Sequence, residues 1–190
     1  MFTNPSNCEH NRQCEFASGE TLREPALAWA VPVAKTLFME TTEVPASRTA
    51  AEVSAELIKA GATQIATDYN DGKVTGLRWT MMVNGQNALF EMPARVFPIY
   101  KLLRERKGIK ITWEPGFKPK DPALWEKAER VAWRQLLRWV QAQNAMIECG
   151  MVQPMEVFTA YWIPPGQERT LFQTMMEQQF KMLPAPEAKQ

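Results

Sequence analysis

The chain has 190 residues, of which 45% are hydrophobic and 23% are charged, a composition typical of soluble globular domains. The formal net charge of +1 excludes a uniformly basic or acidic surface, so an electrostatic binding site has to come from a local imbalance. No apolar run approaches the roughly 18 residues of a membrane span, and three irregularly spaced cysteines do not form a disulfide framework. We therefore expect a cytoplasmic protein that contacts no membrane.

A local imbalance of charge is present in the middle of the chain. Residues 101–138 contain 11 Lys and Arg against 5 Asp and Glu, so this segment carries 11 − 5 = +6. The rest of the chain then holds 11 basic and 16 acidic residues, a balance of −5. The middle segment is the cationic part of the protein.

The first part of the chain lacks regular patterning. Residues 1–38 show no clear periodicity and are predicted to form an irregular N-terminal arm. Cys8, His10 and Cys14 lie in this arm without a fourth ligand nearby, so we predict no metal site there. A single α+β domain is expected over residues 39–183, followed by a disordered tail over residues 184–190.

The first regular element is a helix that ends before Gly61. Thr49 and Glu52 have the spacing of a capping box, in which a hydroxyl and a carboxylate accept hydrogen bonds from backbone amides of the first turn. Val53 and Leu57 continue as an apolar stripe, and Gly61 suits the left-handed conformation that follows a helix. The pattern predicts that Thr49 opens this helix.

Residues 63–92 have the period-two alternation of β-strands. Leu77, Trp79 and Met81, for example, alternate with more polar neighbours. The dipeptides Asp71-Gly72 and Asn84-Gly85 tolerate positive φ and are typical of hairpin turns. The segment is therefore predicted to form a three-stranded antiparallel meander.

A second helix and a loop follow the meander. Val96, Ile99 and Leu103 fall on one helical face, and Gly108 ends the element. Residues 109–113 are predicted to add a short strand, and an exposed loop rich in Pro, Gly and Lys comes after them.

The longest predicted element is a helix in the C-terminal half. Asp121 is a preferred capping residue, and Pro122 suits the first helical position. The helix is predicted to run to Cys149, before Gly150.

Two short helices are expected after the long one. Residues 154–162 are predicted to form the first, which is followed by a turn. Thr170 and Gln173 have capping-box spacing, so they are predicted to open a last helix that reaches about Met182.

The long helix carries four basic residues on one side. At about 100° per residue, Arg130, Arg134 and Arg138 fall within about 60° of Lys127, and the tryptophans lie mainly elsewhere. One interpretation is an ordinary solvated face, partly neutralised by Glu126. The alternatives are a surface that follows a phosphate backbone and one that binds an acidic protein.

If the stripe binds nucleic acid, it continues into the lysine-rich loop that precedes it. Lys and Arg gain affinity by releasing counterions from phosphates, and exposed aromatic rings stack on single-stranded bases. The predicted nucleic-acid-binding residues are Lys107, Lys110, Trp113, Phe117, Lys118, Lys120, Lys127, Arg130, Arg134 and Arg138.

The sequence shows no catalytic signature. His10 is the only histidine and lies in the arm, so the domain has no histidine base. Cys149 follows a glutamate, which disfavours a reactive thiolate, so a buried structural cysteine is expected. Asp68, Asp71 and Glu91 would have to converge to bind a divalent ion, and the turn already explains Asp71. We predict a non-enzymatic protein without metal or cofactor.

Several segments resemble small uncharacterised proteins encoded by phages, prophages and their bacterial hosts. The resemblance lies at residues 44–49, at "GATQIATDY", and most clearly at "AWRQLLRWVQAQNAMIECGMVQPMEVFTAYW" and "RTLFQTMMEQQFKML". It covers about residues 39–183 and implies a phage-linked setting without transferring any site residue. The order of helix, meander and helix is also similar to the core of some phage single-strand annealing proteins, which oligomerise on DNA.

Together these features predict an α+β fold in which a three-stranded antiparallel meander packs against helices, one of them long. The leading hypothesis is a non-enzymatic nucleic-acid-binding protein of phage type, acting in single-strand DNA binding or annealing. The alternative is a phage-encoded protein-interaction module, an inhibitor or an assembly subunit, that docks through the meander edge or the C-terminal aromatic residues. Association into a homo-oligomer fits both roles.

Overall fold

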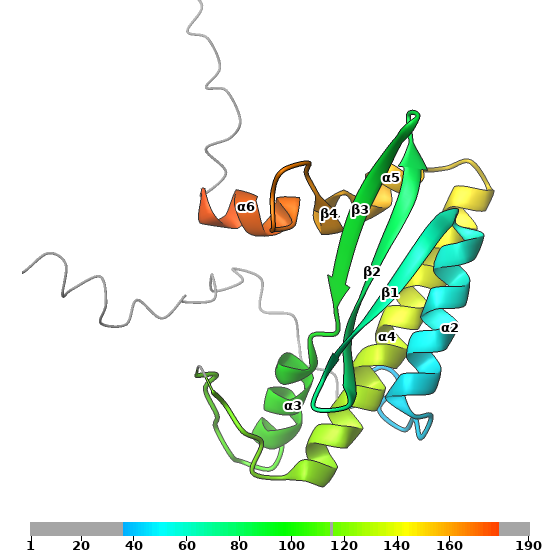
Figure 1. Ribbon diagram of the computed structural model, residues 1–190. Helices are drawn as coiled ribbons and strands as arrows, with labels where there is room; N and C mark the ends of the chain where they lie inside the picture. The colour runs from blue at the N-terminus through cyan, green and yellow to red at the C-terminus, as the bar shows by residue number, and fades with distance from the viewer. Residues whose placement is uncertain (1–35, 115, 179–190) are drawn as a thin grey trace, which may run out of the picture. The chain divides into compact units, whose positions relative to one another are not determined.

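A four-stranded antiparallel sheet with helices on one of its faces makes up the described part of the chain (Figure 1). The computed structural model describes residues 36–114 and 116–178. The predicted N-terminal arm up to residue 35 and the predicted tail at residues 184–190 lie outside the described residues. The predicted α+β class is confirmed.

The sheet has the order β1-β2-β3-β4, and each neighbouring pair is antiparallel. Its strands are β1 (Ala62–Asn70), β2 (Lys73–Val83), β3 (Gln86–Pro93) and β4 (Trp162–Ile163). The first three form the predicted meander, but the predicted count of three strands is wrong, because Trp162 and Ile163 pair with Phe90 and Leu89. A two-residue strand is too short to show an alternating pattern, so only the position of β3 reveals it.

Tight turns at the two predicted dipeptides connect the strands of the meander. The φ angles are 49° and 75° at Asp71 and Gly72, and 50° and 78° at Asn84 and Gly85. Two consecutive positive φ values belong to the two-residue turn whose twist matches that of the flanking strands. These dipeptides therefore set where β2 begins and ends.

The helices of the described residues include one long element and several short ones. They are α2 (Ala46–Lys59), α3 (Val96–Glu105), α4 (Pro122–Glu148), α5 (Pro154–Phe158), the 3-10 helix η1 (Thr159–Tyr161) and α6 (Leu171–Glu177).

Helix α4 is the predicted long helix, and both of its ends lie where the sequence places them. The Asp121 carboxylate accepts a hydrogen bond from the Leu124 amide at 3.0 Å, and Pro122 occupies the first helical position. After Glu148, Gly150 adopts a φ of 69° and ends the helix.

Helix α2 begins earlier than predicted. It starts at Ala46 after an extended Pro45, so Thr49 lies inside the helix and is fully buried. The Thr49 hydroxyl donates to the Pro45 carbonyl at 3.3 Å, so the predicted capping box of Thr49 and Glu52 is wrong. The C-terminal end is as predicted, because Gly61 follows the helix with a φ of 100°.

The C-terminal segment differs in part from the prediction. The helix predicted over residues 154–162 is instead α5, η1 and the first residue of β4. The capping box that opens α6 is confirmed, with Thr170 N donating to Gln173 Oε1 at 2.9 Å and Gln173 N to Thr170 Oγ1 at 3.3 Å. Helix α6 ends at Glu177, and the predicted end near Met182 lies outside the described residues.

The strand predicted over residues 109–113 is also wrong. These residues belong to the irregular connection between α3 and α4 (Figure 1). Within the described chain they have no neighbouring strand, and Ile111 packs instead against the cluster that contains Tyr100 and Leu103.

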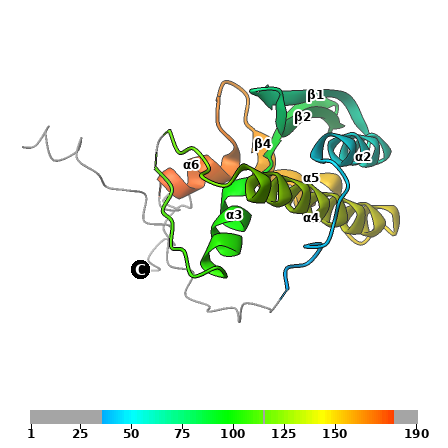
Figure 2. The same ribbon diagram turned by 90° about the horizontal axis from the view of Figure 1, so that it is seen from below.

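The main hydrophobic core lies between the sheet and helices α2 and α4, which run side by side under one sheet face (Figure 2). Its fully buried members include Leu57, Trp79, Phe90, Trp133 and Phe158. Each such side chain stabilises the fold by about 1.5–3 kcal/mol through burial alone. A second, smaller cluster around Tyr100 joins α3 to the start of α4.

The opposite face of the sheet is open to solvent. On β2 the exposed Arg78 and Met82 alternate with the buried Leu77, Trp79 and Met81, as expected for an antiparallel sheet covered on one side. None of the helices within the described ranges is long and apolar enough to cross a membrane.

Candidate nucleic-acid interface

Ion pairs hold most of the predicted basic stripe on α4. Lys127 Nζ lies 3.3 Å from Glu40 Oε1, and Arg130 Nη1 lies 2.8 Å from Glu126 Oε1. Arg134 pairs with Glu52 of α2. Contact with a phosphate would therefore require these three residues to give up a carboxylate partner.

Arg138 is the exposed member of the stripe. Its Nη1 donates to Gln141 Oε1 at 2.9 Å, and the described residues offer it no carboxylate partner. The expectation that the stripe faces solvent thus describes Arg138 well and the other three cations poorly.

Glu40 joins three parts of the structure around Lys127. It accepts a hydrogen bond from the Leu37 amide at 2.7 Å and pairs with Arg106 Nη1 at 2.7 Å. The Leu37 amide, aided by Arg106 and Lys127, lowers the pKa of Glu40 below its usual range, although burial opposes this shift. The carboxylate is therefore held in its charged form, which fixes Lys127 beside it.

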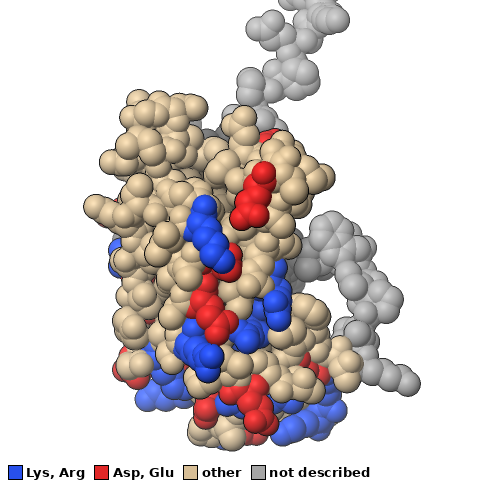
Figure 3. Space-filling view, turned by 90° about the vertical axis from the view of Figure 1, so that its right-hand side faces the viewer, with Lys and Arg blue, Asp and Glu red and all other residues tan. Residues whose placement is uncertain are grey.

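The neutralised stripe follows from how α4 is packed. Because α2 and α3 both contact α4, the buried sector of the helix is wide and its cations lie at the boundary of that sector. Figure 3 shows the side of the molecule on which α2 lies, where basic side chains stand next to acidic ones. At such a boundary the aliphatic part of a cation is buried while its charge meets a carboxylate of the adjoining element.

The connection between α3 and α4 presents the other predicted cations. We call the described residues 107–114 and 116–120 the basic loop. Lys110, Lys118 and Lys120 are exposed, and no described residue forms an ion pair or hydrogen bond with them. Lys107 Nζ lies 3.7 Å from Asp121 Oδ2, and the Lys107 side chain is 56% exposed.

The two predicted stacking residues of the basic loop have different environments. Trp113 is 57% exposed, so much of its surface is accessible to solvent. Phe117 is half-buried, with its ring centroid 5.1 Å from that of Phe97 and 6.0 Å from that of Tyr100. Trp113 is thus available to a ligand, whereas Phe117 anchors the basic loop to the smaller core cluster.

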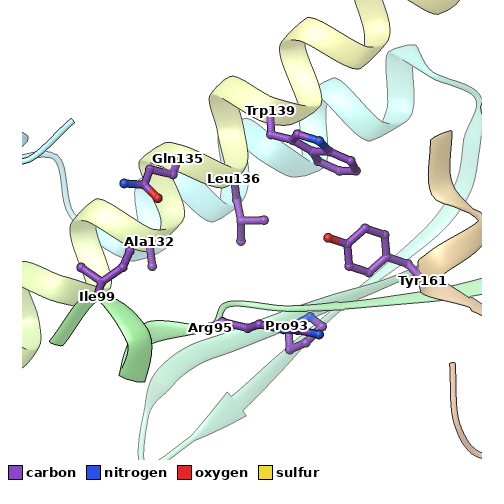
Figure 4. A pocket seen from close by; sticks show the side chains of 8 residues that line it. All are labelled: Pro93, Arg95, Ile99, Ala132, Gln135, Leu136, Trp139 and Tyr161. Atoms are coloured by element: carbon purple, nitrogen blue, oxygen red, sulfur yellow. The ribbon is translucent and has the colours of Figure 1, made fainter. Parts of the chain in front are cut away.

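A shallow pocket of about 260 Å³ lies between α4, the start of α3 and η1 (Figure 4). Apolar walls including Leu136 and Trp139 surround three polar side chains, Arg95, Gln135 and Tyr161. Burial raises the pKa of Tyr161, although Arg95 opposes the shift, so its hydroxyl stays protonated near neutral pH. The residues that line the pocket therefore offer hydrogen-bond donors and no group that exchanges protons near pH 7.

The sequence also offered candidate metal ligands on the meander and a cysteine at the end of α4, and the structure shows where these residues lie. Asp68 accepts hydrogen bonds from Arg78 Nε at 3.0 and 3.1 Å and is an ion-pair partner. Across the described ranges, no three His, Cys, Asp or Glu side chains gather as metal ligands would. Cys149 is exposed, so the expectation of a buried cysteine is wrong.

The sequence analysis did not identify the distant carboxylates that form ion pairs with the basic residues of α4. Glu40 and Glu52 lie 87 and 82 residues before the cations they bind, so helical spacing within α4 cannot reveal them. Only the (i, i+4) pair of Glu126 and Arg130 has a local signal. Comparison of the chain with known protein families, characterised proteins and solved structures gives no match.

Proposed function

We propose that the protein binds single-stranded nucleic acid, without catalysing a reaction, through the basic loop. The exposed Lys110, Lys118 and Lys120 support this proposal, because lysines free of carboxylates can neutralise phosphates. The ion-paired Lys127, Arg130 and Arg134 would instead maintain the shape of α4 beside the loop.

The observation that carries the proposal is the 57% exposure of Trp113 within the same loop as these lysines. Trp113 belongs to neither hydrophobic cluster of the described residues, so core packing does not account for its place in the basic loop. Base stacking on an aromatic ring contributes about 1–3 kcal/mol per base and is available only from unpaired bases. Single strands are therefore the preferred ligand class.

The wider setting also stays a proposal. Sequence resemblance supports a phage-linked, cytoplasmic role in protecting or annealing single strands. Self-association would place several basic loops along one strand and raise the overall affinity by multivalency.

The direct test is fluorescence anisotropy with a labelled single strand of roughly 25 nucleotides and the matching duplex, titrated over a range of salt concentrations. Each phosphate contact to a single strand contributes about −0.7 to the slope of log K against log salt, so three lysines predict a slope near −2. Trp113→Ala should weaken binding by roughly 5- to 150-fold.

Two matched triple variants separate a local site from the total charge. Lys110→Gln/Lys118→Gln/Lys120→Gln should abolish most of the salt dependence. Arg48→Gln/Lys59→Gln/Arg169→Gln removes the same charge from positions that are ion-paired elsewhere, and it should bind nearly as well as the wild type. Equal losses in both triples would contradict the basic loop as the site.

A second candidate is the protein-interaction module, an inhibitor or an assembly subunit. The long unpaired edge of β1 supports this role, because such an edge can accept a strand from another chain. Failure of the wild-type protein to bind either nucleic acid at about 50 mM salt would overturn the first proposal in favour of the second.

A further inference from the structure

The outer edge of β1 has no partner within the described chain. One side of β1 pairs with β2, and no backbone hydrogen bond occupies its other side. On the opposite side of the sheet β3 pairs with the two-residue β4, so β1 is the one edge strand longer than two residues among the described strands. Unpaired amides and carbonyls along such an edge form a template for another strand.

The sequence of β1, "ATQIATDYN", has few of the features that usually protect an edge. It contains no proline, lysine or arginine, and its one charged residue, Asp68, is paired with Arg78. Irregular pairing with β2 occurs near Ala62 and again at Tyr69, which leaves residues 64–68 as a regular stretch. Five residues match the length of a typical strand.

The helix beneath this edge also presents an uncharged flank. Glu52 and Glu56 of α2 point toward α4, where they bind Arg134 and Asn144. At about 100° per residue, the opposite flank consists of Ser47, Ala51, Ser54 and Ile58.

This flank faces away from α4 on the β1 side of the molecule, since α2 lies under β1 and β2 (Figure 2). Ile58 is 61% exposed there, and its small neighbours allow another helix to approach closely. Figure 3 shows a broad area without charged side chains on this side of the protein. Both layers of the fold therefore end at the same edge, where the ion-paired Asp68 is the one charged residue of β1 and the flank of α2 carries none.

We propose that two copies of the chain join through this surface in an antiparallel, two-fold symmetric dimer. Centring the axis on Ala66 places Ile65 opposite Thr67 of the second copy on the helix-covered face. On the open face the same register places Gln64 opposite Asp68 of the second copy. The two sheets become one, and the two α2 helices lie side by side beneath the junction.

Self-complementarity is the reason for choosing a second copy as the occupant. In the antiparallel register the Gln64 amide lies opposite the Asp68 carboxylate of the second copy. The β-branched residues Ile65 and Thr67 lie opposite each other on the helix-covered face, and no like charges are opposite each other. The exposed Ile58 is covered at the same time, which a single added strand would not achieve.

Sedimentation of the full chain over about 1–200 μM tests the proposal, because a dimer equilibrium depends on concentration. Ala66→Lys places two lysines across the axis and should weaken the dimer roughly tenfold, as should Ile58→Glu. Leu89→Lys, on the same sheet face but on β3, is the matched control and should leave the dimer unchanged. Far-ultraviolet circular dichroism confirms that each variant is folded.

Charge complementation gives the sharper result. Mixing Ala66→Lys with Ala66→Glu should restore dimers, since opposite charges then meet at the axis. A monomeric wild type at 200 μM, or a dimer that Ala66→Lys and Ile58→Glu leave intact, would overturn the proposal. Nucleic-acid binding is measured separately, so the two proposals can fail independently.

Discussion

Replacing Phe158 by alanine tests whether the C-terminal segment belongs to the same cooperative core as the meander. Phe158 is fully buried, with its ring centroid 5.5 Å from that of Trp79, 6.3 Å from Phe90 and 5.9 Å from Trp139. These partners come from β2, β3 and α4, so one side chain links α5 to three other elements.

The expected loss follows from this environment. Replacing a buried Phe by Ala costs about 3–5 kcal/mol, and the three ring contacts place Phe158 near 4 kcal/mol. Domains of this size have unfolding free energies of about 5–15 kcal/mol, so the variant should still fold. With a urea slope of about 2 kcal/mol/M, the midpoint should fall by roughly 2 M.

Urea unfolding followed by circular dichroism and by tryptophan fluorescence measures this loss. Phe172→Ala is the matched control, because Phe172 is 40% exposed and its removal should cost less than about 1 kcal/mol. A loss below about 1 kcal/mol for Phe158→Ala, or separate transitions for the two probes, would refute a shared core.

Three further predictions concern single interactions and use the same unfolding assay. The pKa of Glu40 is lower in the folded than in the unfolded protein, so ionised Glu40 increases the free energy of unfolding. This increase is present above the usual glutamate pKa and is lost as the pH falls below about 4. Glu40→Gln should therefore flatten the acid side of the stability profile, whereas Glu43→Gln, at an exposed site, should not. Asp121→Ala should cost about 1 kcal/mol through loss of the α4 cap, and Asp121→Asn should retain most of it; equal losses would assign the effect to another contact. Gly85→Ala should cost about 1–2 kcal/mol because of its φ of 78° alone, since the added methyl group meets no atom within 4 Å, and an unchanged midpoint would contradict the assigned turn.

The accuracy of the predictions depends on whether the signal is local. The turns at Asp71-Gly72 and Asn84-Gly85 were predictable because positive φ is a property of the dipeptide itself. The strand predicted at residues 109–113 is absent because an apolar alternating segment needs a neighbouring strand as well as a pattern. The capping box at Thr49 failed because Pro45 allows the helix to begin one turn earlier.

At the candidate interface too, local features could be predicted from the sequence and long-range contacts could not. Exposure of the lysines around Trp113 was predictable, since a loop rich in Pro, Gly and Lys has few ways to be buried. The environment of Phe117 was not predictable, because its ring partners Phe97 and Tyr100 come from helix α3 and not from the loop itself.

By itself the sequence determined the meander and both ends of α4, because turn dipeptides and helix caps act over a few residues. Only the tertiary structure decided which charges remain open to solvent. Glu40 and Glu52 reach Lys127 and Arg134 across more than 80 positions of sequence, as the separations of 87 and 82 residues show. A carboxylate from a distant element neutralises a cation without leaving a local pattern. Among the predicted cations, accessible positive charge is therefore found on the basic loop and at Arg138, and not along the whole helix stripe.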